Sequence, residues 1–201
     1  MPRQSTTPRK LPQQDRSKVT VEAILTATAH ILTENGYDNA STNRIAERAG
    51  VSIGSLYQYF PNKEAIMTAL RERHVNEMTE IVESALNKSA NHSIEVALHE
   101  LVKACVAAHA IDPILHQVLN EQVPRLSHSS AEAKIITLLR EFLEQRRDQT
   151  QLQNLELTVF ILERTIESLT HAAVIEHPKF LEEQLEEEIT KLLLSYLVGQ
   201  A

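Results

Sequence analysis

The feature that most constrains the fold is a short segment, residues 42–66, with the sequence TNRIAERAGVSIGSLYQYFPNKEAI. Its first part is a short amphipathic helical pattern that Gly50 closes. Ser52 then stands where its hydroxyl can cap the first amides of a second short helix. Asn62 follows a proline and can cap a third, longer helix that begins at Lys63. This order predicts a helix-turn-helix, whose second helix enters the major groove of DNA.

The rest of the chain also predicts helices and no strands. Four glycines and seven prolines are few for 201 residues, and no segment alternates apolar and polar side chains as a strand does. Leu, Ala, Glu, Gln, Ile and Arg fill the long stretches between breaks and lose little entropy in a helix. The chain therefore predicts an all-α fold with nine helices, over about 17–35, 42–49, 53–59, 63–86 and 94–110, a shorter one ending near 123, and about 131–149, 153–176 and 179–198.

Residues 45–64 carry a resemblance to one family. Their sequence fills every fixed position of the pattern I-A-x-x-A-G-V-S-x-G-x-L-Y-x-Y-F-x-x-K-E, which is similar to the DNA-binding signature of the tetracycline-repressor (TetR) family of transcription regulators. The resemblance is specific over residues 42–66 and architectural elsewhere. It implies a nine-helix architecture with a three-helix head and a helical ligand-binding and dimerisation body. It also implies a homodimeric repressor that a small-molecule effector releases from a palindromic operator.

Charge and composition support a division into three parts. Residues 1–15 are rich in Pro, Gln, Ser, Thr and Arg and predict a flexible N-terminal arm. Residues 16–62 form the expected DNA-binding domain, and residues 63–201 form the regulatory and dimerisation domain. Although the net charge is −7, residues 1–63 hold eight basic and five acidic side chains, a balance of +3. Because phosphate attraction is local, a basic head on an acidic body still suits DNA.

The expected DNA contacts surround the second helix of the motif. Gly54 lets the backbone approach DNA, the side chains beside it are small or apolar, and Gln58 can pair with adenine. By the family resemblance, two tyrosines fall where aromatic residues contact phosphates. Basic and hydroxyl side chains at the starts of the neighbouring helices complete the set. The DNA-binding residues are predicted to be Arg16, Thr42, Asn43, Arg44, Ser52, Ile53, Gly54, Ser55, Tyr57, Gln58, Tyr59 and Lys63. Each alone is as easily a surface or half-buried residue, and only their order and spacing favours DNA binding.

The last two predicted helices are apolar over a wide arc, and such a helix needs packing partners on two sides. In the TetR family these helices pair with their copies in a four-helix dimer interface. The predicted interface residues are Leu155, Val159, Leu162, Ile166, Leu185, Ile189, Leu192 and Tyr196. The alternative is that both are ordinary core helices.

A ligand cavity among the middle helices is the other property that the family implies. Cys105 and His109 lie one turn apart and in line with Leu101 on an otherwise apolar helix. The predicted lining is Leu101, Cys105, His109, His116, Phe142, Arg164 and Glu167, although a residue of each kind is more often simply packed in a core or exposed on a surface. The body has no Trp and only four aromatic side chains of Phe and Tyr. We therefore expect an apolar or anionic ligand rather than a quaternary cation held in an aromatic cage.

Several functions are not expected. The single cysteine excludes an intrachain disulfide, and no His-x-x-x-His or Cys/His cluster predicts a metal site or cofactor. No apolar run approaches the ~18 residues that span a bilayer, and no signal peptide is evident, so we expect a cytoplasmic protein without a membrane partner. No nucleophile, metal or phosphate-loop motif predicts an enzyme. A DNA-bound regulator without a ligand pocket, controlled by a protein partner or by abundance, remains the alternative.

Overall fold

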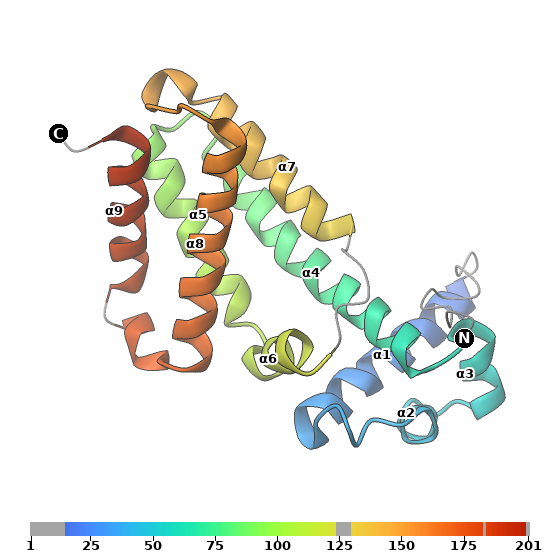
Figure 1. Cartoon of the computed structure of the whole chain (residues 1–201). Helices are drawn as coiled ribbons and strands as arrows, with labels where there is room; N and C mark the ends of the chain where they lie inside the picture. The colour runs from blue at the N-terminus through green and yellow to red at the C-terminus, as the bar shows by residue number, and fades with distance from the viewer. Residues whose placement is uncertain (1–14, 124–129, 183, 200–201) are drawn as a thin grey trace, which may run out of the picture. The chain divides into compact units, whose positions relative to one another are not determined.

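The computed structural model of the chain describes residues 15–123, 130–182 and 184–199 (Figure 1). The expected arm at 1–15 therefore lies outside the described residues, apart from Asp15. Within this described part all regular structure is helical, which confirms the all-α fold with nine α-helices. The α-helices are α1 (Asp15–Asn35), α2 (Thr42–Arg48), α3 (Ile53–Tyr59), α4 (Lys63–Lys88), α5 (Ile94–His109), α6 (Pro113–Glu121), α7 (Ser130–Glu144), α8 (Leu155–Ile175) and α9 (Leu185–Val198), and the 3-10 helices are η1 (Arg147–Gln149) and η2 (Pro178–Glu182).

The chain packs as two compact units. The first contains Met1–His74 and Ile114–His128, and the second contains Val75–Pro113 and Ser129–Ala201. Helix α4 contributes its first half to one unit and its second half to the other. The grouping of α6 with the N-terminal helices is a tertiary feature that the helical patterns did not predict. The functional boundary expected after residue 62 remains a prediction.

The first unit is held by a core between its short helices and the start of α4. Apolar side chains repeat at helical spacing on each segment, so burying one face of each removes them from water. The fully buried members are Ile24 and Leu32 of α1, Ile45 of α2, Leu56 of α3, Phe60, and Ile66, Met67 and Leu70 of α4. Burial of Leu56 and Phe60 confirms that this side of α3 packs inward. The opposite side of α3 is thereby left to the surface.

Local turn chemistry fixes the lengths of these helices as the sequence predicts. Gly36 and Gly50 end α1 and α2 with φ values of 74° and 67°, a left-handed conformation that strains any residue with a side chain. The Ser52 hydroxyl accepts a hydrogen bond from the Ser55 amide at 3.0 Å, and the Asn62 side chain accepts one from the Ala65 amide at 2.9 Å. These caps set where α3 and α4 begin.

Two buried polar contacts attach α6 to α4 within the first unit. The Arg71 guanidinium, which is 9% exposed, donates to the Leu119 carbonyl and to the Val123 carbonyl at 2.8 Å. His74 Nε2 and His116 Nδ1 lie 3.1 Å apart and share a hydrogen bond. Carbonyls at a helix C-terminus lack partners within the helix. Burial also keeps water from these two carbonyls, so Arg71 supplies their hydrogen bonds.

The second unit is a bundle in which α5 packs against α8 and α9, and α7 packs against α8 (Figure 1). Its core contains Leu98 and Leu101 of α5, Leu143 of α7, Leu162 of α8 and Leu193 of α9, each at most 1% exposed. No helix among the described residues is long and apolar enough to cross a bilayer.

Two helices of the second unit are shorter than their patterns predict. Helix α7 ends at Glu144 rather than near 149, because Arg146 turns inward and donates to the Ser89 carbonyl at 2.8 Å. Helix α9 begins at Leu185 rather than near 179, because Gln184 adopts a left-handed φ of 65° that ends any continuous helix. Residues 178–182 form the separate turn η2. Both breaks depend on backbone geometry that hydrophobic spacing does not encode.

Candidate nucleic-acid interface and ligand cavity

The surface of the helix-turn-helix presents the side chains that the sequence predicts for DNA contact. On α3, Ser52, Ile53, Gly54, Tyr57 and Gln58 are exposed, whereas Ser55 and Tyr59 are partly buried. On α2, Asn43 and Arg44 are exposed and Thr42 is partly buried. Arg16 belongs to α1, but its side chain lies outside the described part of the structure. The exposed residues on α3 form a polar surface opposite the buried Leu56, as a helix entering a groove requires.

Thr42 positions the hydroxyl of Tyr57. Thr42 Oγ1 and the Tyr57 hydroxyl share a hydrogen bond of 3.1 Å, which joins the start of α2 to the exposed side of α3. Tyr57 remains 41% exposed, so its hydroxyl stays accessible from solvent. A tyrosine held in one orientation loses less rotamer entropy when it contacts a phosphate. Sequence patterns do not predict this pairing, because the two residues are fifteen positions apart.

Gly54 is not required by the packing of the chain itself. A Cβ built at this position would meet only the Ser52 Oγ, at 3.8 Å, which is ordinary van der Waals contact. Its φ is not in the left-handed region, unlike those of Gly36 and Gly50. An alanine would also form a helix more readily. The packing of the described residues therefore does not account for a glycine at this position.

Two of the three predicted basic contacts also form bonds within the chain. Arg44 is exposed, and its guanidinium donates to the Asn39 carbonyl at 3.1 Å. Lys63 is partly buried: its ammonium donates to the Tyr37 carbonyl at 2.6 Å and lies 3.6 Å from the centroid of the Tyr37 ring. Burial lowers the pKa of Lys63, and nearby acidic groups partly offset that effect. Lys63 thus anchors the segment after α1, a role that the sequence did not predict.

The second unit contains a cavity of about 70 Å³. Its wall is mostly apolar, and its polar members are one histidine and two glutamates from facing helices. The lining residues are Met78, Val82, Leu101, Cys105, Ala108, His109, Ile135, Leu139, Glu163, Ile166 and Glu167. They come from the second half of α4 and from α5, α7 and α8. The cavity therefore opens between helices distant in sequence.

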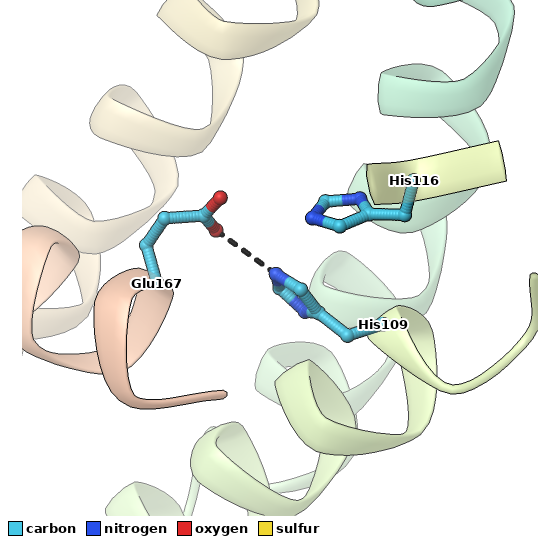
Figure 2. Close-up of side chains that lie close together, drawn as sticks. All are labelled: His109, His116 and Glu167. Atoms are coloured by element: carbon cyan, nitrogen blue, oxygen red, sulfur yellow. Dashed lines mark hydrogen bonds and ion pairs between the residues drawn. The ribbon is translucent and has the colours of Figure 1, made fainter. Parts of the chain in front are cut away.

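A hydrogen-bonded histidine–glutamate pair lies in the wall of this cavity: His109 and Glu167 (Figure 2). His109 is 3% exposed. Its Nε2 lies 3.1 Å from Glu167 Oε2, and its Nδ1 lies 2.8 Å from the Cys105 carbonyl oxygen. A carbonyl can only accept a hydrogen bond, so Nδ1 is the donor to Cys105. An ionised Glu167 likewise accepts from Nε2, and this arrangement favours the protonated imidazole. Burial lowers the pKa of His109, but the hydrogen bond and charge of Glu167 and the Cys105 carbonyl together raise it above its usual value.

Cys105 lines the same cavity as a neutral thiol. Burial, together with the negative charge of Glu167, raises its pKa to about 12. Because the thiolate is the reactive form, the thiol is unreactive near neutral pH. Cys105 is therefore part of the apolar wall.

Four of the seven predicted cavity residues meet at this cavity: Leu101, Cys105, His109 and Glu167. The other three do not line it. Phe142 packs in the core of the unit, the Arg164 side chain pairs with Glu163 at 2.8 Å and is 53% exposed, and His116 belongs to the first unit. The sequence missed the residues from α4 and α7 because they carry no polar signal that separates a cavity wall from a core.

The predicted interface residues of α8 and α9 divide into two groups. Val159, Leu162, Ile166 and Ile189 are buried within the chain, at 4% exposure or less, and Leu155 and Leu185 pack against the same core. These six therefore pack in the chain's own core, and their place in a dimer interface remains a prediction. Leu192 and Tyr196 of α9 are 54% and 45% exposed.

The outward side of α8 carries apolar residues that the prediction left out. Leu157, Phe160 and Leu169 are 52%, 58% and 39% exposed. Both helices thus have a buried apolar side and an exposed apolar side. Large apolar groups gathered on an exposed surface are a feature of protein interfaces.

Comparisons with known proteins agree with this architecture. Residues 24–70 match the sequence model of the family described as "Bacterial regulatory proteins, tetR family". Residues 93–197 match that of "Tetracyclin repressor-like, C-terminal domain". Together these two matches cover both the helix-turn-helix and the helices that enclose the cavity.

Curated relatives match over part of their length. The Fatty acid metabolism regulator protein of Bacillus subtilis (strain 168) is 33% identical over 75 residues, which span 37% of this chain and 39% of the relative. The HTH-type transcriptional activator FasR of Mycolicibacterium smegmatis is 32% identical over 83 residues, which span 41% of this chain and 36% of the relative. The chain thus spans well under half the length of these relatives.

Solved structures match over nearly the whole fold. The fatty acid degradation regulator FadR from Bacillus halodurans superposes with a TM-score of 0.70 at 23% identity, covering 92% of this chain and 97% of that one. A TetR-family transcriptional regulator from Streptomyces coelicolor superposes with a TM-score of 0.65 at 26% identity, covering 90% and 97%. From the two family matches and this shared architecture we conclude that the chain belongs to the TetR family of transcription regulators.

Proposed function

We propose that the protein is a cytoplasmic, homodimeric repressor that binds a palindromic operator and releases it when a small molecule occupies the cavity of the second unit. Two helix-turn-helix heads about one turn of DNA apart read two half-sites, so a symmetric dimer matches a palindrome. A ligand weakens DNA binding only as far as it prefers the conformation that cannot bind.

The observation that carries the DNA-binding part is the polar, exposed side of α3 with Gly54 at its centre. The fold does not need a glycine there, and Tyr57 is held by Thr42 with its hydroxyl accessible. The other predicted contacts lie before, between and after these two residues in the sequence. They are Arg16, Thr42, Asn43, Arg44, Ser52, Ile53, Ser55, Gln58, Tyr59 and Lys63. Phosphate contacts then fix the register, and base contacts supply the specificity.

The cavity favours an effector over the alternative of a regulator without a pocket. It is lined mostly by apolar side chains and has polar groups from α5 and α8, which is the usual composition of a small-molecule site. Its walls include α4, the helix whose first half belongs to the DNA-binding unit.

The test of the DNA-binding part is a genomic selection. The purified protein is incubated with fragmented DNA from its source organism at ~150 mM salt, where non-specific phosphate binding is weak, and the bound fragments are sequenced. We expect enrichment of a palindrome with half-sites one helical turn apart. Binding that shows no enriched sequence and vanishes as salt rises would contradict a sequence-specific regulator.

The direction of regulation needs a separate measurement, because relatives carry both labels: FasR is named an activator, and KstR of Rhodococcus jostii is named a repressor. A reporter gene placed behind the selected operator is expected to be expressed less when the protein is present. Higher expression would assign activation and leave the DNA-binding proposal intact.

A further inference from the structure

The polar groups that the cavity of the second unit offers to a ligand are hydrogen-bond acceptors. We propose that it takes an apolar molecule whose polar head donates hydrogen bonds, such as a primary amine or an alcohol, and that it excludes ionised acids. This inference rests on the proposed role of the cavity as the effector site, and it names the chemical class of that effector.

The walls determine the apolar part of the ligand. Side chains of Met, Val, Leu, Ala and Ile from α4, α5, α7 and α8 supply seven of the eleven lining residues, and the neutral Cys105 thiol adds an eighth surface of low polarity. Displacing water from such walls favours an alkyl or alicyclic group. No Phe, Tyr or Trp is among the lining residues, so these rings offer no cation–π attraction for a quaternary ammonium there.

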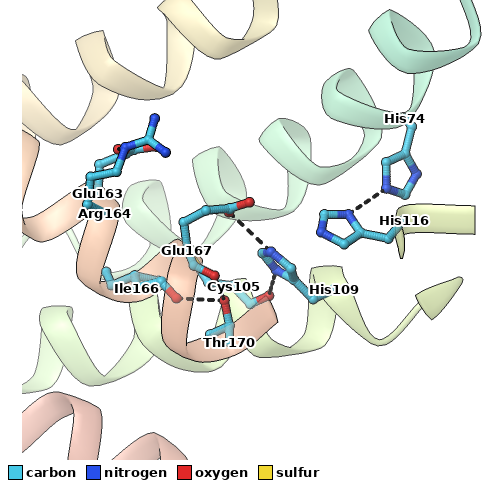
Figure 3. Close-up of polar contacts among 9 residues, drawn as sticks. All are labelled: His74, Cys105, His109, His116, Glu163, Arg164, Ile166, Glu167 and Thr170. Carbon is cyan, nitrogen blue, oxygen red and sulfur yellow. Dashed lines mark hydrogen bonds and ion pairs between the residues drawn. The ribbon is translucent and has the colours of Figure 1, made fainter. Parts of the chain in front are cut away.

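The polar lining residues offer acceptors. Glu163 and Glu167 lie one turn apart on α8 and both line the cavity (Figure 3). A carboxylate has about four lone-pair sites, so each glutamate can accept a ligand hydrogen bond while it keeps its present partner. Their partners include Arg164 for Glu163, at 2.8 Å, and His109 for Glu167, at 3.1 Å.

The only strong donor in the lining is already committed. Both ring nitrogens of His109 donate within the chain, to Glu167 and to the Cys105 carbonyl. The Arg164 guanidinium is not a lining residue, and its side chain is 53% exposed, so solvent screens it. No Lys or Arg is among the lining residues.

These contacts determine which polar head group the cavity prefers. A head with N–H or O–H groups finds carboxylate acceptors, and an ammonium also gains attraction from their charge. A carboxylate head finds two carboxylates, each already paired with His109 or Arg164, and no spare strong donor, so its desolvation is not compensated. The anionic ligand that composition alone favours is therefore disfavoured by the carboxylates that α8 brings to the cavity.

The test uses four small molecules of equal length that differ in the head group: hexylamine, 1-hexanol, methyl pentyl ether and hexanoate. Binding to the full-length protein is measured by calorimetry at pH ~7, where the amine is protonated and the acid ionised. We expect the amine and the alcohol to bind at least about tenfold more tightly than hexanoate, and the alcohol more tightly than the ether, which has no donor.

Variants locate this preference in the cavity. Glu163→Gln combined with Glu167→Gln removes both charges with little change of shape, and we expect the preference for hexylamine over hexanoate to fall by about tenfold. Glu176→Gln, at the exposed end of the same helix, is the matched control and should keep the preference. Circular dichroism verifies that each variant is folded.

Three outcomes would overturn the proposal: hexanoate binds as tightly as hexylamine, the ether binds as tightly as the alcohol, or neither donor molecule binds. The same preparations are assayed for binding to the selected operator. If the protein binds the operator but the four molecules do not show the expected preference, only this inference is refuted. If the four molecules show the expected preference but the protein does not bind the operator, only the proposed regulatory function is refuted.

Discussion

An added Cβ at Gly54 would lie 3.8 Å from the Ser52 Oγ and touch nothing else in the chain, so the fold and the proposed DNA contact make opposite demands on this residue. In Gly54→Ala, we expect the free energy of unfolding to rise by up to ~0.5–1 kcal/mol, because alanine favours the helix. We expect operator affinity to fall about tenfold or more, because the methyl group lies on the side that meets DNA. Urea unfolding and a filter-binding titration measure the two effects.

Ser84→Ala, at an exposed position of α4, is the control for Gly54→Ala. It also introduces an alanine into a helix, but at a position far from α3 in the sequence. Its operator affinity should equal that of the unchanged protein. If Gly54→Ala binds the operator normally, the side of α3 that carries Gly54 does not approach DNA closely.

His109 makes stability depend on pH. Because its pKa is raised in the folded state, the folded protein holds the proton more tightly than the unfolded chain does. The resulting stabilisation is fully present below the unfolded pKa of about 6.5 and is lost as pH rises through the raised folded pKa. The difference in unfolding free energy between the unchanged protein and His109→Gln should therefore shrink as pH rises from acid to alkaline values.

Urea titrations at a series of pH values measure this difference. Glu167→Gln removes the charge that favours the protonated ring, and it should flatten the pH dependence. A difference that grows with pH would show that His109 is neutral in the fold.

At the scale of the secondary-structure elements, Arg146 joins the end of α4 to the end of α7. Its side chain is 3% exposed, donates to the carbonyls of Ser89 and Ala90 at 2.8 and 3.2 Å, and lies 4.6 Å from the centroid of the Phe142 ring. Arg146→Ala removes the buried guanidinium that donates to both carbonyls and opens a void. We expect a loss of ~2–4 kcal/mol in the free energy of unfolding, measured with urea.

Arg147→Ala is the matched control for Arg146→Ala. Arg147 pairs with Glu144 at 3.3 Å on the surface, where its side chain is 58% exposed, and such pairs contribute at most ~1 kcal/mol. Equal losses in the two variants would show that the buried contacts of Arg146 add nothing to stability.

At the scale of the whole molecule, the exposed apolar sides of α8 and α9 lead us to expect a dimer. Leu192 and Phe160 are more than half exposed, and burying them against a second copy would remove apolar area from water. Leu192→Arg should raise the dimer dissociation constant by about a hundredfold or more, because it desolvates a charge at the interface. Sedimentation velocity over a concentration series measures this effect.

The control for the dimer is Ile136→Arg, because Ile136 is 41% exposed on α7, away from α8 and α9 in sequence. It should sediment as the unchanged protein does. Operator affinity should fall in parallel with dimerisation for Leu192→Arg. A variant that remains dimeric would place the interface elsewhere.

Sequence alone determined the features that depend on neighbouring residues. Helical spacing predicted the all-α fold and most helix bounds, and Gly50, Ser52 and Asn62 marked the ends of the helix-turn-helix correctly. These signals are local, because a turn or a cap involves residues within four positions of one another. The family signature over residues 45–64 rests on the same local order.

Contacts between residues far apart in the sequence depend on how the whole chain packs. The tertiary structure grouped α6 with the N-terminal helices, paired His109 with Glu167 at a separation of fifty-eight positions, and turned Ile166 into the cavity wall. Hydrophobic periodicity predicts that one side of a helix is buried. It does not predict which helix packs against that side, because any apolar partner removes it from water equally well. The choice of partner depends on packing the whole chain at once.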